Sequence, residues 1–257
     1  IYLPSKWGSG DGKKVLVVFN GSNYKTTLWI NGVKVGYHEG GYTKFWFNLN
    51  KYVKFGYENK LTIRVDNRYK SGRIPWSKHV DWMNYGGIYR TIYLKVVDPI
   101  HIDDLKISNE VAFNKEIGMG LENPIVDLNF RFKVHDGRPY RRKFKGHIII
   151  TVKNIEGKIK SEEIPVLINP EEEYVIVSSK INLGVINEEN FWSPDHPHLY
   201  KLTFQLVREN DRKELDRITT KWGIRTISIH DGNFYLNNKR IFLKGINRHE
   251  DHPEVGN

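Results

Sequence analysis

Apolar and polar residues alternate one by one along much of this chain. In DLNFRFKV (127–134), KLTIRVDN (60–67) and YKLTFQL (200–206), every second residue is apolar. Because successive side chains of a β-strand point to opposite faces, this period predicts strands with one buried face. Similar patterns predict strands at residues 15–19, 27–31, 33–37, 91–97, 147–153 and 173–178. No window of a dozen residues has a helical period, so we expect an all-β chain of short antiparallel strands.

Turn residues separate the predicted strands and suggest where domains begin. Asn31-Gly32 is a strong signal for a two-residue hairpin, since both central positions of a type I′ turn need positive φ, and Asn237-Asn238 is a weaker one. Pro99 lies between two strand-like runs, where the chain is expected to leave one sheet and enter another. We therefore predict domains at residues 1–98 and 99–219, with residues 220–257 as the start of a larger domain, because a single hairpin cannot form a core.

Composition narrows the class of protein. The chain has 257 residues, 39% of them hydrophobic and 13% aromatic, which indicates a folded protein. It has no Cys, which excludes disulfides, thiolate metal sites and cysteine nucleophiles. No run approaches 18 apolar residues, so we expect no transmembrane helix and no membrane partner. The chain starts at Ile1 without a leader sequence, which suggests that this start is not the natural one and leaves a cytoplasmic location as the expectation.

The net charge of +10 is concentrated in residues 131–160, which hold ten Lys or Arg and two acidic residues. Such a stripe could bind nucleic acid. However, the cations alternate with apolar residues such as Phe130, Phe132 and Ile148, as on the solvent face of a half-buried sheet. We expect the solvated face and no nucleic-acid partner.

The densest group of titratable residues lies at the end of the sequence, in FLKGINRHEDHPEVGN (242–257). A polar end is usually a frayed tail. Four stretches of the chain support another interpretation: LWINGVKVGYHEGGYTKFWFNL (28–49), DWMNYGGIYRTIYL (81–94), FWSPDHPHLYKLTFQL (191–206) and KWGIRTISIHDGNFYLNNKRIFLKGINRHEDHPEVG (221–256). In this order and spacing they resemble glycoside hydrolase family 2, the family of β-galactosidases, β-glucuronidases and β-mannosidases.

The resemblance implies a jelly-roll sugar-binding domain, an immunoglobulin-like β-sandwich, and the first hairpin and strand of a truncated (β/α)₈ barrel. IYLPSKW enters the family pattern partway through, so the first jelly-roll strands are expected to be missing. The polar cluster would then form the rim of an active site, because functional groups gather at the C-terminal ends of barrel strands.

The resemblance also implies substrate-binding residues. Asp81 occupies the position of an aspartate that reaches into the family's sugar pocket, and a carboxylate accepts strong hydrogen bonds from sugar hydroxyls. His249 occupies the position of the pocket histidine. The alternatives are that Asp81 caps a turn and that His249 is a structural loop residue. Supporting roles are expected for Asn247, Arg248, Glu250 and Asp251.

No catalytic residue is expected in this chain. A retaining glycosidase needs two carboxyl groups about 5–5.5 Å apart, and the family's acid/base glutamate follows an Asn. We interpret the two Asn-Glu pairs here, Asn109-Glu110 and Asn187-Glu188, as surface turns. The intact enzyme is expected to hydrolyse terminal β-linked sugars, as a β-galactosidase first and a β-glucuronidase second, and this chain alone to be inactive.

Other properties stay open. A stand-alone carbohydrate-binding protein without catalysis is the alternative from another class. The resemblance leaves open Mg²⁺ or Na⁺ as a cofactor of the intact enzyme, with no complete ligand set in this sequence, and a homo-oligomer as its assembly.

Overall fold

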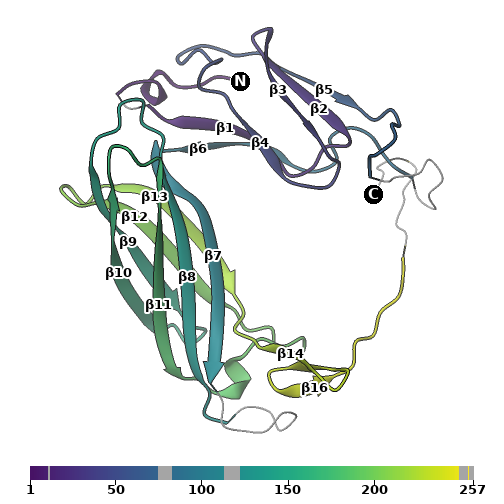
Figure 1. Ribbon diagram of the computed structural model, residues 1–257, viewed down its shortest axis with the longest axis vertical. Coiled ribbons are helices and arrows are strands. Elements are labelled where there is room, and N and C mark those ends of the chain that lie inside the picture. Colours follow the sequence, from purple (N-terminus) through teal and green to yellow (C-terminus); the bar gives the residue numbers. More distant parts are fainter. Residues whose placement is uncertain (11, 75–82, 113–121, 249–253, 255–257) are drawn as a thin grey trace. The chain divides into compact units, whose positions relative to one another are not determined.

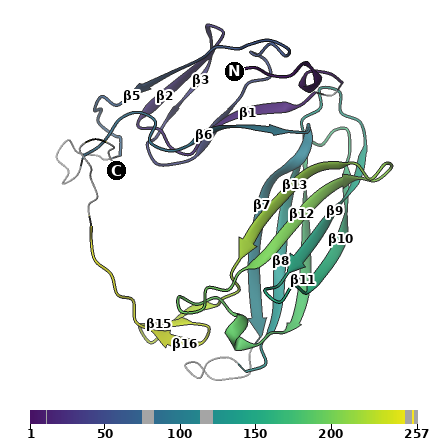
Figure 2. The same ribbon diagram turned by 180° about the vertical axis from the view of Figure 1, so that it is seen from behind.

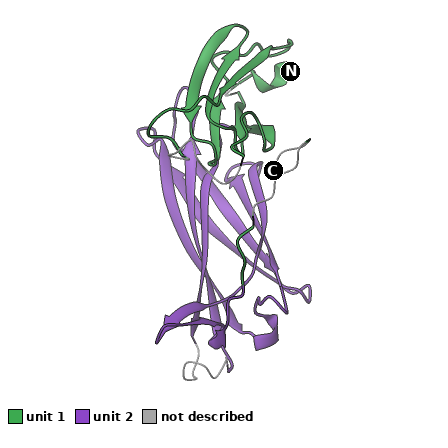
Figure 3. Cartoon of the chain, turned by 90° about the vertical axis from the view of Figure 1, so that its right-hand side faces the viewer, with its two compact units in different colours: residues 1–98, 245–257 green, residues 99–244 purple. Residues whose placement is uncertain are grey.

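The computed structural model describes residues 1–10, 12–74, 83–112, 122–248 and 254. The chain divides into two compact units, unit 1 with residues 1–98 and 245–257, and unit 2 with residues 99–244 (Figure 3). Both are built almost entirely of antiparallel strands, which confirms the predicted all-β class. The predicted domain limits at residues 98 and 219 stay predictions.

Unit 1 contains two three-stranded sheets and a short 3-10 helix, η1 (Ser5–Trp7). One sheet has the order β4-β1-β6 and the other the order β3-β2-β5 (Figure 1). Their strands are β1 (Lys14–Phe19), β2 (Lys25–Ile30), β3 (Val33–Glu39), β4 (Phe45–Asn48), β5 (Leu61–Asp66) and β6 (Ile92–Val97). All pairings are antiparallel, so hairpins and short loops can join them.

The core of unit 1 lies between these sheets, because the apolar residues of each strand alternate onto the inner face. Its fully buried members include Val15 and Phe19 of β1 and Leu28 and Ile30 of β2. The ring of Phe19 stacks on that of Phe45 with centroids 4.7 Å apart. The remaining side chains of β1, β4 and β6 therefore point to the outer face of their sheet.

The hairpin between β2 and β3 follows the turn chemistry of its sequence. Asn31 and Gly32 have φ values of 51° and 83°, as a type I′ turn requires. The Asn31 side chain also accepts a hydrogen bond from the Lys60 backbone N–H at 3.0 Å, which ties the turn to the start of β5. The predicted two-residue hairpin is confirmed.

Unit 2 contains a two-sheet sandwich and a small separate sheet. The sandwich sheets have the orders β10-β9-β12-β13 and β11-β8-β7, which are seen from the two sides in Figures 1 and 2. Their strands are β7 (Ile100–Ala112), β8 (Ile125–Asp136), β9 (Phe144–Lys153), β10 (Ile159–Ile168), β11 (Tyr174–Val185), β12 (Tyr200–Arg208) and β13 (Glu214–Trp222). A 3-10 helix, η2 (Glu188–Asn190), precedes β12.

Three phenylalanines join the two sheets of the sandwich. The ring of Phe204 on β12 meets the rings of Phe130 and Phe132 on β8 at centroid distances of 5.3 and 5.4 Å, edge to face in both cases. All three are at most 2% exposed. The cations that alternate with these residues, such as Arg131, lie on the outer face, as predicted from the sequence pattern.

The small sheet consists of β14 (Ile227–His230), β15 (Asn233–Leu236) and β16 (Lys239–Ile241). Asn237 and Asn238 turn β15 into β16 with φ values of 51° and 60°, so the weaker turn signal also holds. Of the predicted barrel strand, Ile241 ends β16, whereas Phe242 and Leu243 are 83% and 62% exposed and belong to no strand.

Phe204→Ala is expected to lower the free energy of unfolding by about 3–5 kcal/mol, because it removes the ring that fills the space between the two sheets. Urea unfolding of the purified chain measures the change. Tyr140→Ala is the control, since Tyr140 is 88% exposed, and it should change the free energy by less than about 0.5 kcal/mol. Equal effects of the two substitutions would contradict this description of the core.

Candidate functional site

The residues predicted to bind substrate fall largely outside the described part of the chain. Asp81 and His249 lie in the ranges 75–82 and 249–253, as do Glu250 and Asp251. Asn247 and Arg248 are described and are exposed in a segment without regular structure. The assignment of these residues to a sugar site stays a prediction.

The described residues on either side of the range 75–82 are tied together by one side chain, that of Asn67. Arg73 donates from Nη2 to Oδ1 of Asn67 at 2.9 Å. Asn67 in turn donates from Nδ2 to the carbonyl oxygen of Asn84 at 2.9 Å. Asn67 follows directly after β5, so a residue at the end of this strand is hydrogen-bonded to both Arg73 and Asn84, which flank the range 75–82.

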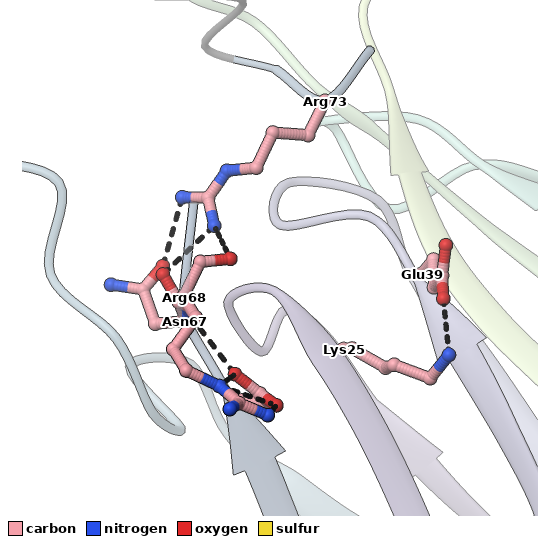
Figure 4. Close-up of polar contacts among 6 residues, drawn as sticks. Lys25, Glu39, Asn67, Arg68 and Arg73 are labelled. Carbon is pink, nitrogen blue, oxygen red and sulfur yellow. Dashed lines mark hydrogen bonds and ion pairs between the residues drawn. The ribbon is translucent and has the colours of Figure 1, made fainter. Parts of the chain in front are cut away.

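Arg73 is the most deeply buried charged group of this arrangement. It is 4% exposed. Its Nη1 donates to the carbonyl oxygens of Asn67 and Arg68 at 2.8 and 3.1 Å, and Figure 4 shows the guanidinium directed at these two residues. The Tyr24 ring lies with its centroid 4.8 Å from the guanidinium carbon. These contacts offset the cost of burying the cation, which would be large without partners.

Asn23 holds the chain after the range 75–82 from a second side. Its Nδ2 donates to Oδ1 of Asn84 and to the carbonyl oxygen of Tyr85, both at 2.6 Å. Its backbone exchanges two hydrogen bonds with Gly87, each of 2.9 Å. We call Asn23, Asn67, Arg73 and Asn84 the asparagine–arginine frame.

The Gly-Gly-Ile-Tyr-Arg run at residues 86–90 packs against this frame. A Cβ on Gly86 would lie 2.6 Å from Cβ of Asn67, and Gly87 has a φ of 102° that favours glycine. Tyr89 donates from its hydroxyl to the carbonyl oxygen of Gly41. Arg90 donates to the carbonyl oxygen of Tyr42 at 3.0 Å. The motif that carried the family resemblance therefore has a structural role in fixing this end of unit 1.

Two carboxylates near the frame, those of Asp66 and Glu39, are each paired with a cation. Asp66 binds Arg68 through two nitrogens, and these hydrogen bonds hold the pKa of Asp66 well below its usual range. Lys25 donates to Glu39, as Figure 4 also shows, which lowers the pKa of Glu39 and raises that of Lys25. Both carboxylates stay ionised at neutral pH and neither has the raised pKa of a general acid.

The two Asn-Glu pairs of unit 2 are not an acid/base site. The prediction of a surface turn was wrong for Asn109-Glu110, which lies inside β7. The alternation of β7 continues through it: the half-buried Asn109 accepts from Trp222 Nε1 at 3.2 Å, and Glu110 is exposed. The surface-turn prediction holds for Asn187-Glu188, which starts η2.

Glu110 has a carboxylate neighbour, Asp127, but this pair does not provide the general acid that a glycosidase needs. Glu110 and Asp127 lie opposite each other on β7 and β8 and share Lys180, at 3.2 and 2.9 Å. Hydrogen bonds from Lys180 and then Asn182 lower the pKa of Asp127. A glycosidase acid needs the opposite shift, so this group is an ion-pair network on the sandwich surface.

Unit 2 also has a cavity of about 680 Å³ at one end of the sandwich. Its lining includes Tyr200, whose pKa burial raises to about 12, and the ion pair of Glu156 with Lys158 at 2.8 Å. The Lys158 hydrogen bond lowers the pKa of Glu156. The cavity therefore has one carboxylate, already engaged by a cation.

The described ranges contain neither a candidate metal site nor a candidate membrane-spanning helix. Within them, no three His, Cys, Asp or Glu side chains are grouped as metal ligands. The same residues include no helix with the length and apolar character that crossing a bilayer requires.

The sequence pattern did not reveal Asn23, Asn67 and Arg73 as functional candidates. Each asparagine lies in a stretch where turn residues are expected. From sequence alone, an asparagine that only forms a turn looks the same as one whose side chain also bonds to a distant residue. The one available signal was the position of Asn67 and Arg73 just before the motif at residues 81–94.

Three family models match the chain in succession. They are described as glycosyl hydrolases family 2, sugar binding domain, at residues 1–109, glycosyl hydrolases family 2, at residues 100–225, and glycosyl hydrolases family 2, TIM barrel domain, at residues 227–257.

Curated relatives align with nearly the whole chain. A β-galactosidase of Thermoanaerobacter pseudethanolicus is 33% identical, over 95% of this chain and 30% of that protein. A putative β-glucuronidase of Formosa agariphila is 30% identical, over 96% of this chain and 27% of that protein. The chain thus spans less than a third of the length of either relative.

Solved structures share the fold. A Bacteroides uniformis β-glucuronidase has a TM-score of 0.81 at 25% identity, with 100% of this chain and 29% of that one covered. A putative β-galactosidase from Bacteroides fragilis has a TM-score of 0.82 at 23% identity, with 99% and 36% covered.

Asn67→Ala is expected to lower the free energy of unfolding of unit 1 by about 1–3 kcal/mol, because it leaves buried groups of Arg73 and Asn84 without their partner. Hydrogen exchange followed by mass spectrometry should show the loss at residues 83–90. Asn129→Ala is the control, since Asn129 makes no side-chain hydrogen bond to any described residue. Unchanged exchange at residues 83–90 in Asn67→Ala would contradict the role of the frame.

Proposed function

The chain belongs to glycosyl hydrolases family 2, and on this premise we propose that it forms the supporting N-terminal part of a retaining β-glycosidase. The intact enzyme removes terminal β-linked sugars, with β-galactosides as the first substrate class. The observation that carries the proposal is the succession of three family 2 models along one chain, in the order sugar-binding domain, central domain and barrel.

The choice of sugar rests on relatives and on residues near the chain's end. The 33%-identical relative is named a β-galactosidase, and the run NRHEDHP at residues 247–253 is closest to that branch. β-Glucuronidase is the second candidate, because the 30%-identical relative is a putative β-glucuronidase and DWMNYGGIYR fits both branches equally well.

Retaining hydrolysis needs a nucleophilic carboxylate and a second carboxyl group that first protonates the leaving oxygen. The second group must hold a proton near neutral pH, so its pKa must be raised. Among the residues that the structure describes, every carboxylate with a shifted pKa has it lowered instead, by an Arg or Lys partner, as with Asp66, Asp127, Glu163 and Glu214. We therefore assign both catalytic carboxyl groups to polypeptide outside these 257 residues.

The contribution of this chain is substrate binding. The Asp81 carboxylate accepts hydrogen bonds from sugar hydroxyls, and the His249 imidazole donates one while its other nitrogen is fixed by a neighbour. The asparagine–arginine frame supports this role, because it binds the side chain of Arg73 and the backbone of Asn84, each two residues from an end of the range that contains Asp81. Asn247, Arg248, Glu250 and Asp251 have supporting roles beside His249.

The chain alone is expected to give no turnover of 4-nitrophenyl β-D-galactopyranoside, because it lacks the carboxyl pair. A stand-alone carbohydrate-binding protein, the alternative function, would instead bind galactosides with measurable heat in calorimetry while also giving no turnover. Turnover that is lost in Asp81→Ala would contradict the assignment of the chemistry to other polypeptide.

In a full-length enzyme that contains these residues, Asp81→Asn is expected to lower kcat/KM for the galactoside about 10–100-fold. This is the scale of one hydrogen bond to a charged group. Asp195→Asn is the control, since Asp195 is exposed and makes no ion pair to a described residue. Equal kcat/KM values for the Asp81→Asn enzyme and the unsubstituted enzyme would exclude Asp81 from the sugar site.

A further inference from the structure

The outer face of the β4-β1-β6 sheet carries two exposed aromatic side chains. Trp46 of β4 is 58% exposed and Tyr93 of β6 is 37% exposed. Both lie directly opposite Val18 of β1, so all three form one row across the sheet. Their neighbours in sequence, such as Phe45 and Phe19, pack into the core on the other face. Tyr and Trp are enriched at binding interfaces, because each ring combines a large apolar surface with a polar group.

The spacing of the two rings suits an extended ligand. Trp46 and Tyr93 are two strands apart, so their backbones are separated by about 10 Å. Val18 between them is 2% exposed and does not stand out from the surface. Two rings at this separation can each stack on a different ring of a linear ligand.

The same face has a one-sided charge. Lys44 precedes β4, and its Nζ lies 5.8 Å from the centroid of the Tyr93 ring. Lys95 lies one row further, opposite Leu16 of β1. β1, β4 and β6 contain no acidic residue, and neither Lys44 nor Lys95 forms an ion pair with any residue that the structure describes. We call Lys44, Trp46, Tyr93 and Lys95 the aromatic–lysine face. Its charge is complementary to an anionic ligand.

The other sheet of unit 1 also carries an exposed aromatic residue, Tyr37, but this ring already has a charged partner. Tyr37 of β3 is also 58% exposed. However, the ammonium group of Lys25 lies 4.5 Å from its ring centroid, and Lys25 is paired with Glu39. Tyr37 is therefore a matched control for Trp46, equal in exposure and different in surroundings.

We propose that the aromatic–lysine face binds a chain of β-linked sugars that contains uronic acids, outside the site of hydrolysis. The rings of Trp46 and Tyr93 stack on the apolar faces of two sugars, and Lys44 and Lys95 bind carboxylates. Aromatic rings and lysines also suit single-stranded nucleic acid. The choice of a glycan rests on the proposed function, since a glycosidase that holds a longer chain on a second surface gains in effective concentration of substrate.

The test is calorimetry of the intact 257-residue chain with a hyaluronan oligosaccharide, whose alternate sugars are uronates. Cellohexaose serves as the neutral glycan and poly(dT) as the other polyanion. The chain is expected to bind the hyaluronan oligosaccharide more tightly than either. Trp46→Ala should weaken this binding about tenfold, the order of one lost stacking contact, whereas Tyr37→Ala should leave it unchanged. Lys44→Glu combined with Lys95→Glu should weaken it further and remove most of its salt dependence.

Several results would overturn the proposal: no binding of hyaluronan, equal binding of cellohexaose, tighter binding of poly(dT), or full binding by Trp46→Ala. If Trp46→Ala fails to fold, as judged by circular dichroism, Trp46→Phe and the double lysine variant decide, because Phe keeps a stacking ring and should keep most of the affinity. The assay measures binding without turnover, so failure of the glycosidase proposal in a galactoside assay remains distinguishable from failure here.

Discussion

The side chain of Asn67 is the contact on which the proposed role of unit 1 depends. It accepts from the buried guanidinium of Arg73 and donates to the backbone of Asn84, and thereby holds two points of the chain that are eleven residues apart in sequence. Asn23 adds a second set of hydrogen bonds at Asn84 and Tyr85. An amide can do this because it carries a donor and an acceptor on one rigid group. Backbone that is fixed before a ligand binds loses less entropy on binding.

The strands follow from the sequence because alternation is a local property. The apolar residues of β8 and β12 occur at every second position, and the structure buries them between the two sheets. Asn31-Gly32 likewise determines its own turn through backbone sterics. The interpretation of Asn109-Glu110 as a turn was wrong because turn propensity of a dipeptide is weak beside the alternation of β7 that contains it, which runs from Asp104 to Ala112.

The asparagine–arginine frame and the aromatic–lysine face could not be predicted in this way. Asn67 meets Asn84 through a side-chain hydrogen bond that spans 17 residues of sequence. Trp46 shares a row with Tyr93 only through the pairing of strands that are distant in sequence. Nothing in the local sequence distinguishes Trp46, which is exposed, from a core tryptophan. The proposed substrate residues Asp81 and His249 came from family resemblance, and periodicity and composition gave no indication of them.

The electrostatics of the chain agree with a supporting role. Among the described residues, the shifted carboxylates have lowered pKa values because Arg or Lys partners donate to them. Such groups bind and orient, and they do not deliver protons. The most direct measurement is a crystal structure of a full-length enzyme containing this chain, with a bound sugar. The account predicts that the Asp81 carboxylate and the His249 imidazole both lie within hydrogen-bond distance of hydroxyls of one sugar. Either side chain directed away from that sugar would contradict it.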